Sequence, residues 1–156
     1  MSWEIGKHGS KLGQDGLTEI QRKENKNMLR EMWDERKKIL INISNHPSNL
    51  WTKEQKGSWK KIIDIKFPDV PAESSSNKVY TLIDNLLNEE IYPTIERVET
   101  EGEVFFMLQG EFSFCYKLLP ILQKIGAIAV PTTKREVVEK DGIKTSIFKF
   151  VRWRII

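Results

Sequence analysis

Hydrophobic and polar residues alternate in blocks along most of this chain, and the blocks have the lengths of strands and helices. The segment from about Asn77 carries apolar residues at helical spacing. Short apolar runs that suit buried strands occur at residues 38–44, 62–67, 103–109 and 127–131. Strands that alternate with helices in this way predict a parallel sheet with right-handed crossovers.

Two capping boxes mark the starts of further helices. Thr18 with Gln21 fits this motif and predicts a helix over residues 17–37. Thr52 with Gln55 repeats the motif and opens a short helix expected to include Trp59. The first helix has only a thin apolar stripe, so it needs a partner surface to be stable.

Proline positions refine the two later helices. The helix from about Asn77 is expected to kink or end at Pro93, and Pro120 should kink the helix that follows Gly110. Gly126 is suited to the position just after that helix. The predicted buried side of this last helix consists of Phe112, Cys115, Tyr116, Leu119 and Leu122.

The C-terminal part has a different pattern. Asp141-Gly142 is a strong signal for a two-residue hairpin turn between strands. The predicted fold is therefore α/β: a mostly parallel sheet flanked by helices, with a C-terminal β-hairpin and an N-terminal helical extension. We expect residues 1–37 to form an N-terminal arm and helix, and residues 38–156 to form the domain.

Basic and aromatic residues interleave in the last strand. Such a pattern occurs in nucleic-acid-binding segments, and it also occurs in a half-buried strand, which we favour here. We expect no sequence-specific DNA binding. A protein held to DNA mainly by charge would usually show a basic stripe or arm. The residues concerned are Lys149, Arg152 and Arg154 with Phe148, Phe150 and Trp153.

Composition limits the classes of function. The 156 residues are 39% hydrophobic, enough for one domain with a core, and the net charge of +3 permits a phosphate-bearing partner. Cys115 is the only cysteine, and His8 and His46 are the only histidines, so a zinc site is not expected. No run approaches a membrane span and the start has no secretory pattern, so a cytoplasmic location without membrane contact is predicted.

Polar segments follow three of the predicted strands. In open parallel sheets, ligands bind beyond the carboxyl ends of the strands. We therefore expect these segments to meet at one crevice. The candidate ligand-binding residues are Ser44, Asn45, Ser48, Gln109, Gly110, Glu111, Phe112, Ser113, Thr132 and Thr133, with His46 and Arg135 as candidate catalytic groups.

Each of these residues also has an ordinary structural reading. Asn45 and Ser48 are common in turns. Gly110 either lets backbone approach a ligand or simply begins a helix, whose N-terminus favours anions. Glu111 would repel phosphate there; it suits a ribose hydroxyl or complements the helix dipole. Arg135 either grips a phosphate or is solvated at the start of a hairpin.

The strand that ends in Ser-Asn-His-Pro-Ser, followed by Trp51-Thr-x-x-Gln55, resembles the start of small single-domain CRISPR-associated proteins of the CARF type. The resemblance covers residues 38–156 and implies a Rossmann-like sheet. It also implies a ligand site formed by Ser44–Ser48 and Gln109–Ser113. The chain departs from the family where Gln-Gly-Glu-Phe replaces a Gly-Gly-x-Lys segment, so Lys134 or Arg135 would have to supply the positive charge.

The resemblance implies a cyclic oligoadenylate ligand bound across a homodimer in CRISPR-linked antiviral defence, with no cofactor and no metal. Some members of this type cleave the ring as metal-independent phosphodiesterases, called ring nucleases. In that chemistry His46 would act as general acid or base and Arg135 would stabilise the phosphorane. The sequence leaves open whether the ligand is turned over.

Two alternatives remain open from the sequence. One is a non-enzymatic interaction module that docks on a protein through the N-terminal helix and the basic-aromatic tail. The other is a small nucleotide-binding protein unrelated to CRISPR systems.

Overall fold

The computed structural model describes residues 16–34 and 37–156, with side chains described for residues 16–28 and 37–156. The chain falls into two units that divide after Arg36. Helix α1 (Glu19–Asp34) belongs to the first unit. Its capping box is confirmed: Thr18 Oγ1 accepts from the amide of Gln21 at 3.2 Å, and Gln21 Oε1 accepts from the amide of Thr18 at 2.9 Å. Residues 35–36 of the predicted helix, and His8, lie outside the described residues.

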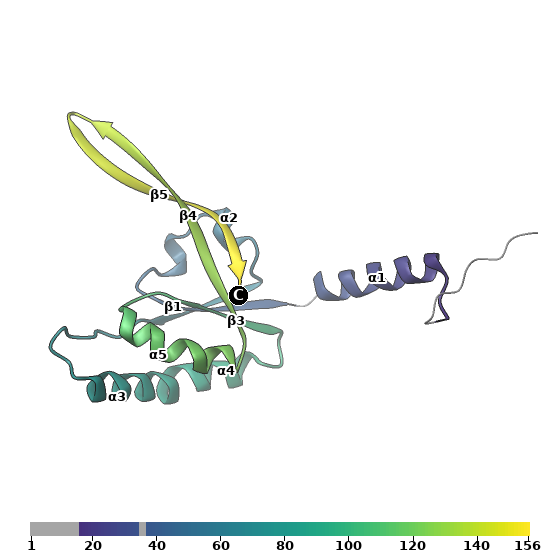
Figure 1. Ribbon diagram of the computed structural model, residues 1–156, viewed down its shortest axis with the longest axis horizontal. Coiled ribbons are helices and arrows are strands. Elements are labelled where there is room, and N and C mark those ends of the chain that lie inside the picture. The colour runs from purple at the N-terminus through teal and green to yellow at the C-terminus, as the bar shows by residue number, and fades with distance from the viewer. Residues whose placement is uncertain (1–15, 35–36) are drawn as a thin grey trace, which may run out of the picture. The chain divides into compact units, whose positions relative to one another are not determined.

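A five-stranded sheet organises the second unit and confirms the predicted α/β, Rossmann-like fold (Figure 1). The strand order is β2-β1-β3-β4-β5. The first four strands are parallel, and the last pairs antiparallel with its neighbour. The strands are β1 (Lys38–Ser44), β2 (Lys61–Lys66), β3 (Glu103–Leu108), β4 (Ala127–Lys140) and β5 (Ile143–Ile155).

Short and long helices connect these strands. Thr52 caps the helix after β1 as its sequence predicts, but this helix ends at Lys56, so Trp59 lies outside it. Described in chain order, the helical elements of the second unit are η1 (Ser48–Leu50), α2 (Lys53–Lys56), α3 (Ser76–Leu86), the π-helical turn η2 (Leu87–Ile91), α4 (Tyr92–Val98) and α5 (Phe112–Gln123).

The helical path does not end at Pro93. Pro93 lies in the first turn of α4, directly after the π-helical turn η2. A proline lacks an N–H group and crowds the carbonyl four residues before it, and a π-turn widens the helix at that point. Helix α5 likewise continues through Pro120 to Gln123.

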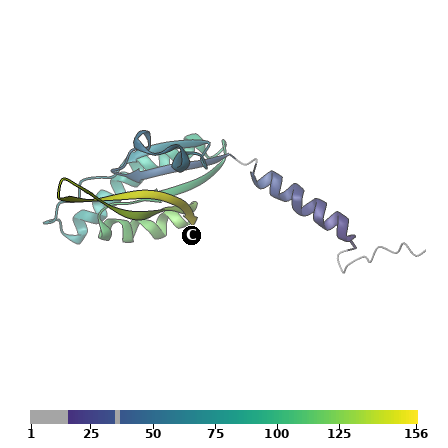
Figure 2. The same ribbon diagram turned by 90° about the horizontal axis from the view of Figure 1, so that it is seen from above.

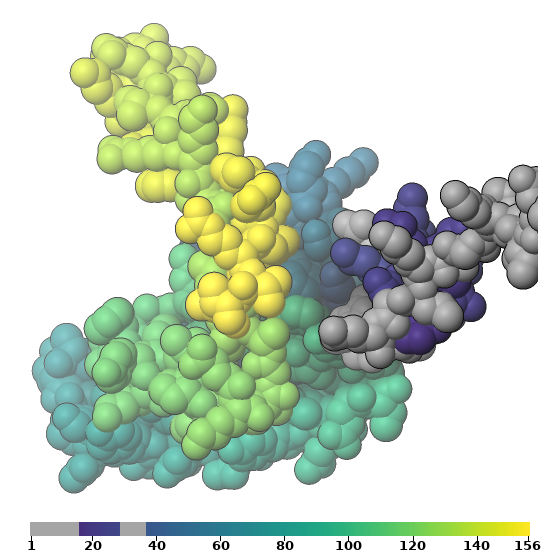
Figure 3. Space-filling model, turned by 45° about the vertical axis from the view of Figure 1, so that its right-hand side comes forward, coloured from purple at the N-terminus to yellow at the C-terminus, as the bar shows by residue number. Residues whose placement is uncertain are grey.

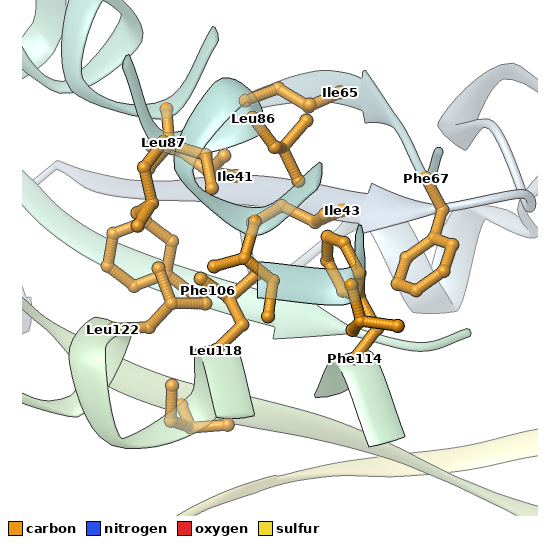
Figure 4. Packing of buried hydrophobic residues seen from close by; sticks show 14 residues of the cluster. Ile41, Ile43, Ile65, Phe67, Leu86, Leu87, Phe106, Phe114, Leu118 and Leu122 are labelled. Atoms are coloured by element: carbon orange, nitrogen blue, oxygen red, sulfur yellow. The ribbon is translucent and has the colours of Figure 1, made fainter. Parts of the chain in front are cut away.

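Helices α3, α4 and α5 lie together on one side of the sheet (Figure 1). Their apolar side chains pack on β1 and β3 in one continuous core, of which Figure 4 shows the centre. Every residue of β1 from Ile39 to Ser44 is buried, which confirms that this strand is covered on both faces. The largest fully buried side chains on the helical side are Ile41, Ile43, Ile91, Phe106, Phe114, Leu118 and Leu122.

The predicted buried side of α5 was partly wrong: Leu122 is buried and Cys115 and Leu119 are partly buried against the core, but Phe112 and Tyr116 are not. Phe112 is 79% exposed and Tyr116 is 65% exposed, whereas Phe114 and Leu118 are fully buried. The stripe Phe114, Leu118, Leu122 also has helical spacing and shares Leu122 with the predicted one, so periodicity alone did not distinguish them. Contact with Phe67, whose ring lies 4.9 Å from that of Phe114, fixes the helix in the observed rotation.

The opposite face of the sheet has a smaller cover made largely of tryptophans. Trp59 packs on Phe105 with ring centroids 5.2 Å apart, and on Trp153 at 5.3 Å. Trp51 lies 5.6 Å from Trp153. The indole N–H of Trp153 donates to the carbonyl of Gln55 at 2.9 Å, which ties β5 to α2. These rings cover Leu40, Phe105, Met107 and Ala129 of the sheet.

The predicted hairpin is confirmed. Asp141 and Gly142 both have positive φ, 53° and 75°, as a two-residue hairpin turn of type I′ requires. The segment 131–135, expected as a polar segment after the fourth strand, is part of β4, which continues through it to Lys140. Beyond the sheet, β4 and β5 pair only with each other and form a twisted two-stranded ribbon (Figures 1 and 2).

No helix among the described residues is long and apolar enough to cross a membrane.

Candidate functional site

The sheet has a topological switch point at β1. The chain leaves β1 toward β2 on one side, and β3 then pairs on the other side. The segments that follow β1 and β3 therefore go to opposite faces of the sheet, and a crevice opens between them at the carboxyl edge. A hollow of about 560 Å³ lies at this edge, lined by Asn45, His46, Pro47, Leu50, Trp51, Gln55, Met107, Gln109, Pro131, Thr133 and Phe148.

A buried polar network begins inside β1 and shapes the segment that follows it. Asn42 is fully buried, and its amide group donates to the carboxylate of Asp64 at 2.8 Å and to the carbonyl of His46 at 2.9 Å. The Ser44 hydroxyl donates to the Asn42 side-chain oxygen at 2.7 Å and accepts from the amide of His46 at 3.1 Å. Ser44 therefore holds the loop in place and does not face the hollow.

The same network extends to the next turn. The Ser48 hydroxyl and amide both donate to the Asp64 carboxylate, at 2.9 and 3.1 Å. The Trp51 indole donates to the carbonyl of His46 at 3.1 Å. Ser48 and Trp51 are thus held by hydrogen bonds within the protein. The side chains of Asn45 and His46 are exposed at the hollow, and neither forms a hydrogen bond with another group of residues 37–156.

The end of β3 lies beside the end of β1. The amide of Gln109 donates to the carbonyl of Ile43 at 3.1 Å, and the Gln109 side chain reaches the hollow. Gly110 is packed against the ring of Phe67, where a β-carbon would lie only 2.3 Å from the ring. This contact explains the glycine without a ligand.

Glu111 occupies the N-terminus of α5. Its carboxylate accepts from the Ser113 amide at 3.1 Å, the Phe114 amide at 2.9 Å and the Ser113 hydroxyl at 2.6 Å. The hydroxyl of Ser113, followed by the two amides, lowers the pKa of Glu111. The position that would suit a phosphate is thus filled by the protein's own carboxylate.

Phe112 and Ser113 do not reach the switch-point hollow. They border a separate hollow of about 240 Å³ between α3 and α5, together with Tyr80, Tyr116 and Lys117. The sequence placed them at the crevice because they follow Gly110, but α5 turns them toward its outer side.

The β4 residues divide in the same manner. Thr133 lines the hollow, whereas the Thr132 hydroxyl donates to the Arg152 carbonyl at 3.1 Å. The Arg135 guanidinium donates to the Ser146 hydroxyl at 2.9 Å, out on the ribbon. No lysine or arginine is among the residues that line the hollow, so its chemistry is amide, imidazole, hydroxyl and aromatic.

Several important residues were missed by sequence reasoning. Asn42 and Asp64 each stand as the one polar residue inside an apolar run, and they are direct partners in the β1–β2 register. A polar side chain in a buried strand needs a hydrogen-bond partner, and this was the signal that could have predicted the network. Other missed residues are Trp51, Gln55, Met107 and Phe148, which build the walls of the hollow.

Among the described residues, no group of three or more His, Cys, Asp or Glu side chains is placed to hold a metal ion. Comparison with curated proteins and with solved structures gave no match. A family model does match residues 38–154, which span the sheet up to the last residue of β5. By that match the chain belongs to the family described as the uncharacterized protein MJ1673 family.

Proposed function

We propose that the protein binds a cyclic oligonucleotide, of the cyclic oligoadenylate class implied by the CARF resemblance, in the switch-point hollow. The observation that carries this proposal is a neutral, aromatic-walled hollow at the carboxyl edge, with unpaired amide and imidazole side chains on its rim. Rossmann-like sheets bind nucleotides at this position.

The walls suit a nucleobase. Trp51, Met107 and Phe148 offer flat or polarisable surfaces, and stacking of one base on an aromatic ring is worth about 1–3 kcal/mol. Asn45 and Gln109 each carry a donor and an acceptor on one amide group, which matches the N6 and N7 atoms of adenine. The hydrogen bond that fixes Trp51 prepares one wall in advance.

The size of the hollow favours two copies of the chain. Its volume of about 560 Å³ is within the range of a pocket for one small ligand. A ring of several nucleotides is larger than that, so each copy in a homodimer would hold one part of the ring. A symmetric ligand matches the two-fold symmetry of such a dimer.

Cleavage would depend mainly on His46, which is the titratable side chain among the residues lining the hollow. Its imidazole would take the proton of a ribose 2′-OH, the oxygen would bond to the adjacent phosphorus, and the 5′-oxygen would leave and take a proton from water. Arg135 lies outside the hollow, and its guanidinium donates a hydrogen bond to Ser146. Because no lysine or arginine lines the hollow to stabilise charge on a phosphate, we propose binding as the principal function and slow turnover as secondary.

The test is a thermal-shift titration with cyclic tetra-adenylate and cyclic hexa-adenylate, with AMP and ATP for comparison. A ligand at one hundred times its Kd stabilises the folded state by about 2.7 kcal/mol. Gln109→Ala should lose most of the shift. Gln123→Ala changes the same residue type at the exposed end of α5 and should keep it.

If neither cyclic tetra-adenylate nor cyclic hexa-adenylate raised the melting temperature, the proposed ligand would be overturned. His46→Ala should keep the thermal shift and slow the appearance of linear products. Equal rates of product formation in the wild type and in His46→Ala would remove His46 from the reaction.

A further inference from the structure

The ribbon formed by β4 and β5 is solvent-exposed along nearly its whole length. The sequence favoured a half-buried last strand, and this was wrong, because most residues of β5 are exposed. Pairing with β3 involves only Ala127 and Ile128 of β4. From Thr133 outward the two strands contact each other and project as an arm, which is clear in the space-filling view (Figure 3).

Residues directly opposite each other in an antiparallel pair share a face, and successive residues alternate between faces. A register shift between Thr132 and Thr133 leaves Val151 of β5 without a partner residue, so the faces are followed along β4 and carried across to β5 by the pairing. The register therefore places five cations on one side of the ribbon. This basic face consists of Lys134, Lys140, Lys149, Arg152 and Arg154. Its one carboxylate, Glu136, forms an ion pair with Lys149 at 2.7 Å.

The other side of the ribbon has a different character. It carries Phe148, Phe150 and Trp153 and is continuous with the hollow, which Phe148 lines. Its cations are Arg135 and Lys144, and Glu139 lies directly opposite Lys144. The ribbon thus separates an aromatic face from a basic face.

The excess positive charge of the chain is concentrated in this arm. The arm together with its base, residues 131–154, holds seven lysines and arginines and three acidic residues, a net charge of +4, to which Arg152 and Arg154 at the base contribute two. The whole chain has a net charge of +3, so everything outside residues 131–154 amounts to −1. A charge concentrated on an exposed arm is the electrostatic footprint of a polyanion-binding surface.

We propose that the basic face of the ribbon binds duplex DNA through its phosphate backbone, without reading sequence. A two-stranded β-ribbon has the width to enter the major groove of B-form DNA. Lys134 and Lys140 are six residues apart on one strand, roughly 20 Å at about 3.4 Å per residue, which is over half a turn of the duplex.

Duplex is favoured over single-stranded nucleic acid because of where the aromatic residues lie. Single-strand binding combines cations with rings on which bases stack. Here the rings are on the opposite face from the cations. This inference goes beyond the proposed cyclic-oligonucleotide site, since the hollow contains no cation and the basic face does not line it.

The test is fluorescence anisotropy with a labelled 20-base-pair duplex DNA and the matching single strand, between 50 and 200 mM salt. Non-specific binding is expected in the micromolar range, roughly 10⁻⁶ to 10⁻⁴ M at physiological salt and tighter at 50 mM. The double variant Lys140→Ala with Arg152→Ala removes one lysine near the turn and one arginine near the body. It should weaken duplex binding at least tenfold at 50 mM salt and reduce the slope of log K against log salt by about 2.

The matched control is Lys144→Ala with Arg135→Ala, which removes the same charges from the aromatic face and should stay within threefold of the wild type. The basic-face variant should keep the wild-type melting temperature and the wild-type shift with cyclic oligoadenylates, so failure of one proposal is distinguishable from failure of the other. Equal loss in both double variants, tighter binding of the single strand, or no duplex binding at 50 mM salt would each overturn the inference.

Discussion

The two faces of the sheet differ in how their side chains are used. On the helical face, α3, α4 and α5 close over a continuous apolar core. On the opposite face, a smaller apolar cluster under three tryptophans gives way to the Asn42–Asp64 network and an open hollow. The sheet therefore separates a face that supplies stability from a face that presents chemistry.

This difference shows how a small domain keeps polar groups available. Burial of the helical face supplies most of the apolar stabilisation. The network on the other face uses nearly all of its own hydrogen-bonding groups to fix one loop, so only the rim side chains are left for a ligand. Changes on the helical face should therefore alter stability most, and changes on the open face should alter the site.

The largest effect is expected in the helical core. Phe114→Ala removes a fully buried ring that packs on Phe67. We expect a loss of about 3–5 kcal/mol in the free energy of unfolding, measured by urea denaturation. Phe112→Ala, two residues earlier on the exposed side of α5, should change it by less than about 0.5 kcal/mol. A larger loss for Phe112→Ala would show that the observed rotation of α5 is incorrect.

An intermediate effect is expected in the polar network. Asn42→Ala leaves the Asp64 carboxylate, the Ser44 hydroxyl and the His46 carbonyl without a shared partner. We expect a loss of about 1–3 kcal/mol and a smaller thermal shift with the cyclic ligand, because the loop is loosened.

Asn45→Ala is the matched change for stability, three residues away, exposed and unbonded within the described domain. It should alter the free energy of unfolding by less than about 0.5 kcal/mol. If Asn42→Ala and Asn45→Ala lowered the free energy of unfolding equally, the hydrogen-bond network would not be what stabilises the open face.

The smallest effect concerns the cap of α5. The pKa of Glu111 is lowered, first by the Ser113 hydroxyl and then by two backbone amides, so the charged form favours the folded state. That contribution is present above the unfolded-state pKa and is lost as pH falls through the lower folded-state pKa. The difference in melting temperature between wild type and Glu111→Gln should be largest near neutral pH and disappear in acid.

Ser113→Ala removes the largest cause of the shift and should reduce this pH dependence while keeping its direction. A difference between wild type and Glu111→Gln that is the same at pH 7 and at pH 3 would show that the carboxylate charge plays no part in the cap.

The order and type of the elements followed from the sequence because their signals are local. Apolar runs gave the buried strands, Thr18 and Thr52 gave two helix starts, and Asp141-Gly142 gave the hairpin turn. Each of these depends on residues within a few positions of one another, so no knowledge of the fold was needed.

The rotation of α5, the length of β4 and the exposure of β5 did not follow from the sequence. Two overlapping stripes of α5 both had helical spacing, and contact with Phe67 favours the one containing Phe114. The length of β4 depends on pairing along its whole length with β5, from Lys140 opposite Ile143 to Ala129 opposite Ile155. Most of β5 is exposed because, among the described strands, β4 is the one that pairs with it, and α2 meets it near its end at Trp153; no local pattern records this.

The sequence by itself determined that polar segments follow the buried strands of a mostly parallel sheet. Only the tertiary structure decided which of those polar groups are used internally. Asp64 accepts a hydrogen bond from Ser48, the ring of Phe67 leaves no room for a side chain at Gly110, and Glu111 caps its own helix. The physical reason is that a polar group is available to a ligand only if no protein group satisfies it first, and those partners are set by strand register and helix rotation across the whole domain.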